Sequence, residues 1–204
     1  MTKNQSSNKS LLKLAKLPTK WHDVSLDDFT DPQKSRLKHF GDNVEDYRKD
    51  GIGLYIYGPP GSGKSRFLYT AALSVMSSTR MGVRVRYFNS LVSMLTSSWV
   101  GGSDSNFFKA ITYPDFLFVE DLGAEIKRNE TSNLAKTVIE QILTYRSDLK
   151  KPTIISSRET PDNLSNIYGE GVSSKLKETS LGVLMPDYDY REKIRQENKK
   201  KYSI

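Results

Sequence analysis

The stretch Gly58-Pro59-Pro60-Gly61-Ser62-Gly63-Lys64-Ser65 fits the pattern G-x-x-x-x-G-K-[ST] at every fixed position. Glycines let successive backbone N–H groups turn inward around a phosphate chain, and a helix beginning at about Gly63 adds its positive end. We expect Lys64 to reach the β- and γ-phosphates, and the Ser65 hydroxyl to take one Mg²⁺ position. The stretch therefore predicts a loop that binds ATP with Mg²⁺.

The residues on either side of this loop support the prediction. Residues 53–57 (Gly-Leu-Tyr-Ile-Tyr) predict a buried strand. Residues 66–76 predict a helix with one apolar side, formed by Phe67, Leu68, Ala71, Ala72 and Val75. A chance glycine-rich turn is the alternative, but it requires neither the strand before it nor the helix after it.

Strand and helix patterns alternate along the rest of the chain. Further strands are predicted at residues 83–88, 116–119, 152–157 and 182–185, and helices at 31–47, 89–95, 104–111, 130–148, 160–168 and 172–178. We place a loop at residues 101–103 and see no internal repeat. This alternation indicates an α/β protein with a parallel sheet covered on both faces.

Two acids follow the apolar run of residues 116–119, and they complete the expected chemistry. A nucleoside triphosphatase needs one carboxylate near Mg²⁺ and another that orients and deprotonates the attacking water. We assign Glu120 to the metal side and Asp121 to the water, although acids here also fit caps of the next loop. Arg158 or Ser157, at the end of a later strand, is placed to contact the γ-phosphate; alternatively, Arg158 pairs with Glu159 or Asp162.

Charge divides the 204 residues into a near-neutral centre and two basic ends. The formal net charge is +7. Residues 1–20 hold five lysines and no acid, and residues 191–201 hold six basic residues and two acids. We therefore expect an ATPase domain at residues 21–190, a basic N-terminal segment at 1–20 and a basic C-terminal tail at 191–204. Such ends favour an acidic partner, DNA or protein; solvated disorder is the alternative.

Composition also indicates in which cellular compartment the protein works. The chain has no cysteine, which suits the cytoplasm. The apolar residues 11–17 are interrupted by Lys13 and Lys16, so they predict neither a signal peptide nor a membrane span. Leu11, Leu14 and Ala15 instead share one helical face, which either docks on a partner or packs on the chain's own core.

Three further motifs make the sequence similar to a known family. Residues 17–29 contain Leu-Pro-Thr-Lys-Trp and Ser-Leu-Asp-Asp-Phe, residues 119–125 read Val-Glu-Asp-Leu-Gly-Ala-Glu, and residues 187–191 read Asp-Tyr-Asp-Tyr-Arg. Together with the phosphate loop they resemble the AAA+ ATPases of the bacterial helicase-loader group, DnaC and DnaI, and their relative IstB. The resemblance covers about residues 17–191, and residues 90–111 lie where the group carries a helical insertion.

The resemblance implies a three-layer AAA+ fold with a central five-stranded parallel sheet. It also implies an ATP-dependent homo-oligomer, an open spiral, that delivers or remodels a replicative DNA helicase on single-stranded DNA. Because such loaders usually grip the helicase through a longer N-terminal domain, residues 1–20 would have to do so here, or the partner differs. A loader reduced in this way would suit a phage or another mobile element.

The chain departs from the family pattern in three regions. Glu120 stands where the family has aspartate, Arg158 stands where it has asparagine, and Gly171 and Lys175 stand where it has arginines. Since lysine cannot make the bidentate contact of an arginine finger, we expect slow hydrolysis. Two alternatives to the loader remain: an IstB-like transposition ATPase on duplex DNA, and a non-catalytic nucleotide-binding adaptor or inhibitor of a host loader or helicase.

Overall fold

Five parallel strands form the centre of the protein in a computed structural model that describes residues 12, 15–101, 105–124 and 132–202. The strands are β1 (Gly53–Tyr57), β2 (Val83–Tyr87), β3 (Phe116–Leu122), β4 (Thr153–Ser157) and β5 (Ser180–Leu184). Their order across the sheet is β2-β3-β4-β1-β5. All carboxyl ends therefore meet at one edge, and β1, which precedes the phosphate loop, pairs with both β4 and β5.

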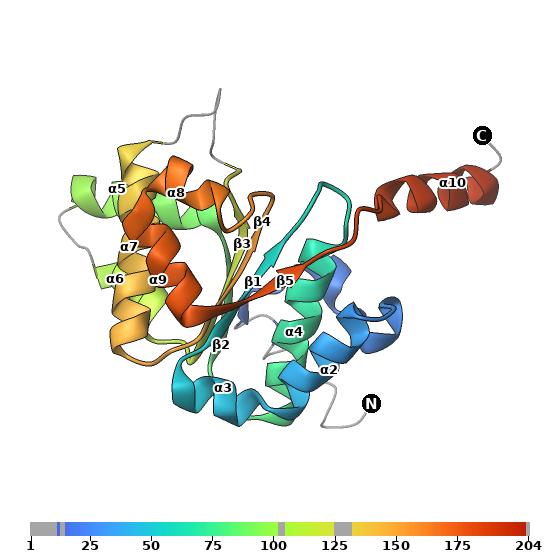
Figure 1. The fold of residues 1–204 in the computed structure, drawn as a ribbon, viewed down its shortest axis with the longest axis horizontal. Coiled ribbons are helices and arrows are strands. Elements are labelled where there is room, and N and C mark those ends of the chain that lie inside the picture. Colours follow the sequence, from blue (N-terminus) through green and yellow to red (C-terminus); the bar gives the residue numbers. More distant parts are fainter. Residues whose placement is uncertain (1–11, 13–14, 102–104, 125–131, 203–204) are drawn as a thin grey trace.

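Helices cover both faces of the sheet (Figure 1). One face carries α2 (Gln33–Asp42), α3 (Val44–Asp50) and α4 (Lys64–Ser78), whereas the other carries α5 (Phe88–Gly101), α6 (Ser105–Thr112), α7 (Asn133–Asp148), α8 (Asn163–Tyr168) and α9 (Glu170–Thr179). Two short 3₁₀ helices, η1 (Thr19–Trp21) and η2 (Leu26–Asp28), precede α2. The predicted three-layer α/β fold is confirmed.

The side chains of β3 explain why its sequence is apolar without interruption. Phe116 and Phe118 enter the core on the α4 side, whereas Leu117 and Val119 enter the core on the α7 side. A strand with helices on both faces buries every residue, so a period-two pattern does not arise. Glu120 continues the alternation and lies on the α4 side, next in line after Phe118.

Two local predictions were wrong. The helix expected at 31–47 is two helices, because the chain turns at Asn43, whose side-chain amide donates to the His39 carbonyl at 2.7 Å. The second strand ends at Tyr87, and Phe88 already begins α5. Residues 191–202 of the predicted basic C-terminal tail belong to α10 (Tyr190–Tyr202), which projects from the body in Figure 1.

Arg146 of α7 holds together the end of the sheet opposite the phosphate loop. Its guanidinium is fully buried and donates hydrogen bonds to the carbonyls of Ile111, Pro114, Asp115 and Pro152 and to the hydroxyl of Thr153. These acceptors belong to the segments that lead into β3 and β4. Burial lowers the pKa of Arg146, and the five bonds compensate for the lost hydration.

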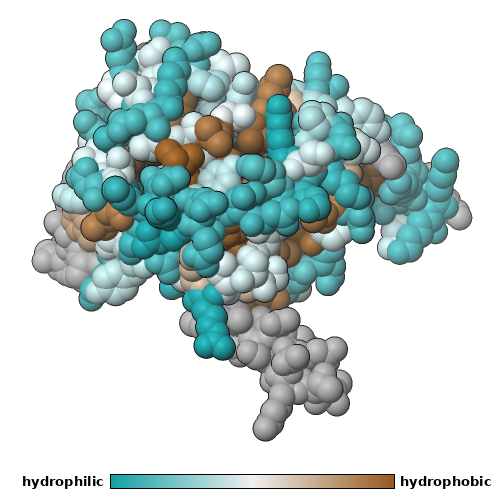
Figure 2. Space-filling view, turned by 60° about the horizontal axis from the view of Figure 1, so that its bottom comes forward, coloured by the Kyte–Doolittle hydropathy of each residue, from teal (hydrophilic) through white to brown (hydrophobic). Residues whose placement is uncertain are grey.

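Some predictions fall outside the described residues, namely most of the segment 1–14, the loop at 102–103, Asp104 and Glu130. Within the described part of the chain, no helix combines the length and apolar character needed to cross a membrane. Figure 2 shows a face on which hydrophilic residues predominate and apolar residues form small separate groups.

Candidate nucleotide-binding site

The phosphate loop connects β1 to α4 and has the backbone that its glycines predict. Gly61 and Gly63 have φ angles of +83° and +91°, which side chains rarely adopt. Gly61 also permits a close approach, since a Cβ there would lie 2.0 Å from a carboxylate oxygen of Asp189. The Ser62 side chain is buried, and its hydroxyl has no hydrogen-bond partner among the described residues.

Lys64 begins α4 and points back into the loop. Its ammonium donates to the carbonyls of Gly58 and Pro59 at 2.8 and 2.7 Å. Burial, followed by the nearby cation of Arg158, lowers the pKa of Lys64 to about 8. An anion bound here would therefore gain a desolvated, poorly neutralised cation, as expected for a lysine that binds phosphate.

The two acids lie at the carboxyl end of β3, but their surroundings differ. Glu120 is 6% exposed and accepts a hydrogen bond from the hydroxyl of Tyr69 on α4. Asp121 is partly exposed and has a φ of +62°, at an irregularity in the pairing between β3 and β4. Its backbone N–H donates to the Ser156 hydroxyl at 3.0 Å. The turn of the backbone at Asp121 separates the directions of the two carboxylates, so they can perform different tasks.

Arg158 follows β4 and lies beside Asp121. Its Nε is 3.7 Å from the Asp121 Oδ1, and both side chains are partly exposed. The alternative partners predicted for Arg158 are engaged elsewhere, because Asp162 pairs with Lys177 and Glu159 accepts from Asn163. Ser157, the other candidate for the γ-phosphate contact, is fully buried and donates to the Leu122 carbonyl, which leaves Arg158 as the stronger candidate.

A cleft of about 830 Å³ brings these groups together. The predicted residues that line it are Pro60, Gly61, Gly63, Lys64, Ser65, Glu120, Asp121 and Arg158. Its volume is within the range of small-ligand sites. The sequence therefore predicted the phosphate-loop and strand-end residues that line the cleft, but not the residues that line its other sides.

Residues from both ends of the chain were missed as parts of the site. The Tyr190 backbone N–H donates to the Gly61 carbonyl at 3.1 Å, and Arg191 next to it lines the cleft and lowers the pKa of Lys64 further. Lys20 and Trp21 line the cleft from η1. These residues were missed because they lie far from the phosphate loop in sequence. The family resemblance of the motifs at 17–29 and 187–191 was the sequence signal that could have assigned them to the site.

The oxygens in the cleft fit Mg²⁺ bound together with a nucleotide. The described residues contain no group of three or more acidic, histidine or cysteine side chains suited to a metal alone. Mg²⁺ at nucleotide sites instead takes one or two protein oxygens and completes its shell with phosphates and water. The hydroxyl of Ser65 and the carboxylate of Glu120 are hard donors of this kind at the cleft wall.

Comparison with known proteins identifies the family. The model of the ATPase family associated with various cellular activities (AAA) matches residues 54–169, more than half of the chain. The protein therefore belongs to the AAA family. This membership and the residues of the cleft both indicate nucleotide binding.

Individual relatives narrow the similarity to helicase loaders. The chain is 26% identical over 161 residues to the replicative helicase loader DnaI of Bacillus subtilis, covering 78% of this chain and 50% of that protein. It is 22% identical over 165 residues to the replicative helicase loader DnaC of Escherichia coli K12, covering 79% and 65%. A crystal structure of the DnaC helicase loader superimposes with a TM-score of 0.72 at 23% identity, covering 83% of this chain and 100% of that one. The resemblance to this group is thereby confirmed.

Proposed function

We propose that the protein is an ATP-dependent loader that delivers or remodels a replicative DNA helicase on single-stranded DNA. The observation that carries the proposal is the cleft. The phosphate loop, the carboxylates of Glu120 and Asp121, and residues of the motifs at 17–29 and 187–191 meet there. Similarity to DnaI and DnaC supports the helicase as partner. The chain spans 50% and 65% of the length of these relatives, so the proposal of a helicase partner rests on the shared ATPase region.

In this proposal each cleft residue has a separate role. Lys64 binds the β- and γ-phosphates, and Ser65 and Glu120 hold Mg²⁺, which neutralises phosphate charge when bound. Asp121 orients the attacking water and accepts its proton. Arg158 contacts the γ-phosphate.

The segment 1–20 is proposed to bind the helicase. Its four lysines before Lys20, which lines the cleft, would steer the approach to an acidic surface, and Leu11 and Leu14 would anchor it in a groove. Leu11→Asp combined with Leu14→Asp is expected to abolish the helicase complex and leave ATP affinity unchanged. Normal complex formation by this variant would place the contact on the ATPase domain instead.

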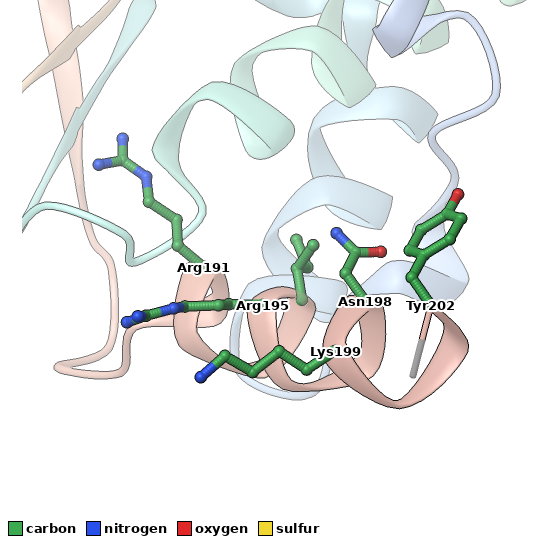
Figure 3. Close-up of a pocket in the computed structure, with 6 residues that line it drawn as sticks. Arg191, Arg195, Asn198, Lys199 and Tyr202 are labelled. Atoms are coloured by element: carbon green, nitrogen blue, oxygen red, sulfur yellow. The ribbon is translucent and has the colours of Figure 1, made fainter. Parts of the chain in front are cut away.

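The DNA contact is proposed to include α10. This helix carries six basic and two acidic residues, and Arg191, Arg195 and Lys199 recur every four positions. Figure 3 shows these three side chains extending toward the left of the view, whereas Asn198 and Tyr202 of the same helix point upward. At a rise of about 1.5 Å per residue the row is roughly 12 Å long, which suits a phosphate backbone, and the exposed Tyr202 offers a surface for stacking a base.

Salt dependence tests this contact. Arg195→Gln with Lys199→Gln should weaken binding of a labelled single-stranded oligonucleotide and reduce the slope of log affinity against log salt by about 1.4. Lys34→Gln with Lys38→Gln on α2 removes the same charge far along the chain and is the matched control. An unchanged slope in the α10 variant would remove α10 from the DNA contact.

Recovery of partners from the native cell tests the function itself. With ATP present, the wild-type protein should recover the replicative helicase, and Lys64→Ala should recover much less. A transposase together with a preference for long duplex DNA would establish the IstB-like alternative. Intact ATP binding without hydrolysis, even with helicase and DNA, would establish the adaptor, which Gly171 and Lys175 favour.

A further inference from the structure

Two tyrosines from separate elements, Tyr69 and Tyr87, lie next to Glu120. Tyr69 comes from α4 and donates its hydroxyl to the Glu120 Oε2. Tyr87 ends β2 and is paired in register with Glu120 on the neighbouring strand. Trp21 of η1 then stacks on Tyr69, with ring centroids 5.1 Å apart and planes 16° apart, and the Lys20 ammonium lies 4.4 Å above the Trp21 ring. Tyr69 thus connects the cleft carboxylate to a wall built by η1.

The contact between Tyr69 and Glu120 is well defined because both groups are buried. Tyr69 is fully buried, and a buried phenol needs a hydrogen-bond partner. Its ring is fixed between the α4 core and Trp21, so its hydroxyl cannot turn to water. The carboxylate that it holds belongs to a side chain with three rotatable bonds, one more than aspartate would have.

We propose that Tyr69 is a positioning residue that sets the location of the Glu120 carboxylate in the cleft, and that Trp21 holds Tyr69 in place. This inference rests on the proposed role of Glu120 in holding Mg²⁺. Glutamate has one methylene more than aspartate, so its carboxylate can reach more places in the cleft. The hydrogen bond from Tyr69 restricts the longer side chain to one arrangement, and so allows glutamate to serve at this strand end.

Tyr69→Phe tests the proposal, since it removes the hydroxyl and keeps the stacked ring. The measurement is the affinity for a non-hydrolysable ATP analogue, determined with Mg²⁺ and with EDTA. The gain in affinity that Mg²⁺ provides should fall about three- to tenfold, and the affinity in EDTA should stay within twofold of wild type. An unchanged gain from Mg²⁺ would overturn the proposal.

Tyr55→Phe is the matched control for a structural effect. The Tyr55 hydroxyl is also buried and donates at 2.8 Å, but to the Glu159 carbonyl. Both variants should lower the melting temperature of the nucleotide-free protein, whereas only Tyr69→Phe should reduce the gain from Mg²⁺. A similar reduction in both would show that the effect is general destabilisation, and would overturn the positioning role.

The same change in a Glu120→Asp background tests whether the hydroxyl acts through Glu120. Aspartate is one methylene shorter and does not reach the Tyr69 hydroxyl, so adding Tyr69→Phe should change the gain from Mg²⁺ by less than twofold. An equal loss in both backgrounds would overturn the proposal. Trp21→Leu, which keeps the hydroxyl and removes its stacking partner, should lower the gain in the glutamate background; no change would refute the role of Trp21.

These outcomes are separable from failure of the proposed function. If the wild-type protein binds no nucleotide, the nucleotide site itself is wrong. If it binds nucleotide with a clear gain from Mg²⁺, and Tyr69→Phe behaves as wild type, the site stands and the positioning role of Tyr69 falls.

Discussion

Asp121 and Arg158 form an ion pair of 3.7 Å across the ends of the neighbouring strands β3 and β4. The pair joins the carboxylate assigned to the attacking water to the cation assigned to the γ-phosphate. Exposed pairs of this length contribute little to stability, so exchanging the partner of Arg158 costs little free energy. A γ-phosphate can therefore compete with Asp121 for Arg158, which would release the carboxylate when ATP is bound.

Arg158→Ala should discriminate between ATP and ADP. If Arg158 contacts the γ-phosphate, affinity for a non-hydrolysable ATP analogue should fall about tenfold, and affinity for ADP should stay within twofold of wild type. Calorimetric titration of both nucleotides measures this. Arg158→Lys, which keeps the charge and loses the planar fork, is the control and should give an intermediate loss. Equal losses for ATP and ADP would contradict the γ-phosphate assignment.

Lys64→Ala should abolish ATP binding and leave the fold intact. The ammonium bonds to two carbonyls of its own loop and to no core group among the described residues, so its removal takes away the phosphate contact and little packing. We expect affinity to fall about a hundredfold or more, with a melting temperature no lower than that of the wild type. Unchanged ATP affinity would show that the loop does not bind nucleotide.

The lowered pKa of Lys64 predicts a dependence of ATP affinity on pH. The ammonium is charged below about pH 8 and becomes neutral above it in the empty site. Phosphate binds the charged form, so above pH 8 binding requires uptake of a proton and affinity should fall by up to about tenfold per pH unit. Affinity measured between pH 7 and 9.5 tests this, and a flat profile would contradict it.

The lowered pKa of Lys64 affects the stability of the nucleotide-free protein in the opposite direction to its effect on ATP affinity. Between pH 8 and the ordinary Lys pKa of 10.5, the unfolded chain binds more protons at this position than the folded chain does. Stability of the nucleotide-free protein should therefore rise with pH through this window as far as Lys64 contributes. Comparison of wild type with Lys64→Ala isolates this contribution.

Asp121→Asn should trap the ATP-bound state. The amide cannot accept the proton of the attacking water, whereas the phosphate contacts of Lys64 remain. Hydrolysis should fall by about 10²–10⁴-fold while ATP affinity stays within a few-fold of wild type. Rapid filtration with labelled ATP measures retention of unhydrolysed nucleotide. Hydrolysis at the wild-type rate would move the role of the base to another group.

The sequence predicted the sheet and the cleft well because both depend on local patterns. An apolar run followed by two acids defines the carboxyl end of β3, and the glycine pattern defines the loop between β1 and α4. The carboxyl ends of parallel strands meet at one edge, so these features had to converge.

The unpredicted parts depend on contacts between distant residues. The hydrogen bond from Tyr69 to Glu120 joins residues 51 positions apart, and Tyr190 reaches the loop across more than a hundred residues. No periodic pattern marks such contacts. The turn at Asn43 was missed for a different reason, since the apolar periodicity of residues 31–47 continues through it.

Arginine introduced at Gly171 and Lys175, the positions where the family resemblance implies arginine fingers, should raise the rate of hydrolysis. Gly171 lies near the start of α9, and a side chain there meets no atom within 4 Å. Arginine is also a better helix former than glycine, so Gly171→Arg should preserve the fold. Lys175 lies on the same helix and pairs with Glu178 at 3.3 Å. Gly171 is therefore open to substitution, and Lys175→Arg keeps the positive charge that faces Glu178.

Gly171→Arg with Lys175→Arg is expected to increase the rate at least about tenfold, because an arginine finger contributes roughly 10³–10⁵ where its geometry is complete. If the protein assembles with ATP, the rise should appear as protein concentration increases, because the added arginines would then act on a neighbouring subunit. Gly171→Lys is the control, as it adds the charge without the bidentate fork, and its rate should stay close to wild type. An equal rise in the lysine variant would assign the effect to charge alone, and no rise at concentrations where the protein assembles would show that α9 does not face the neighbouring site.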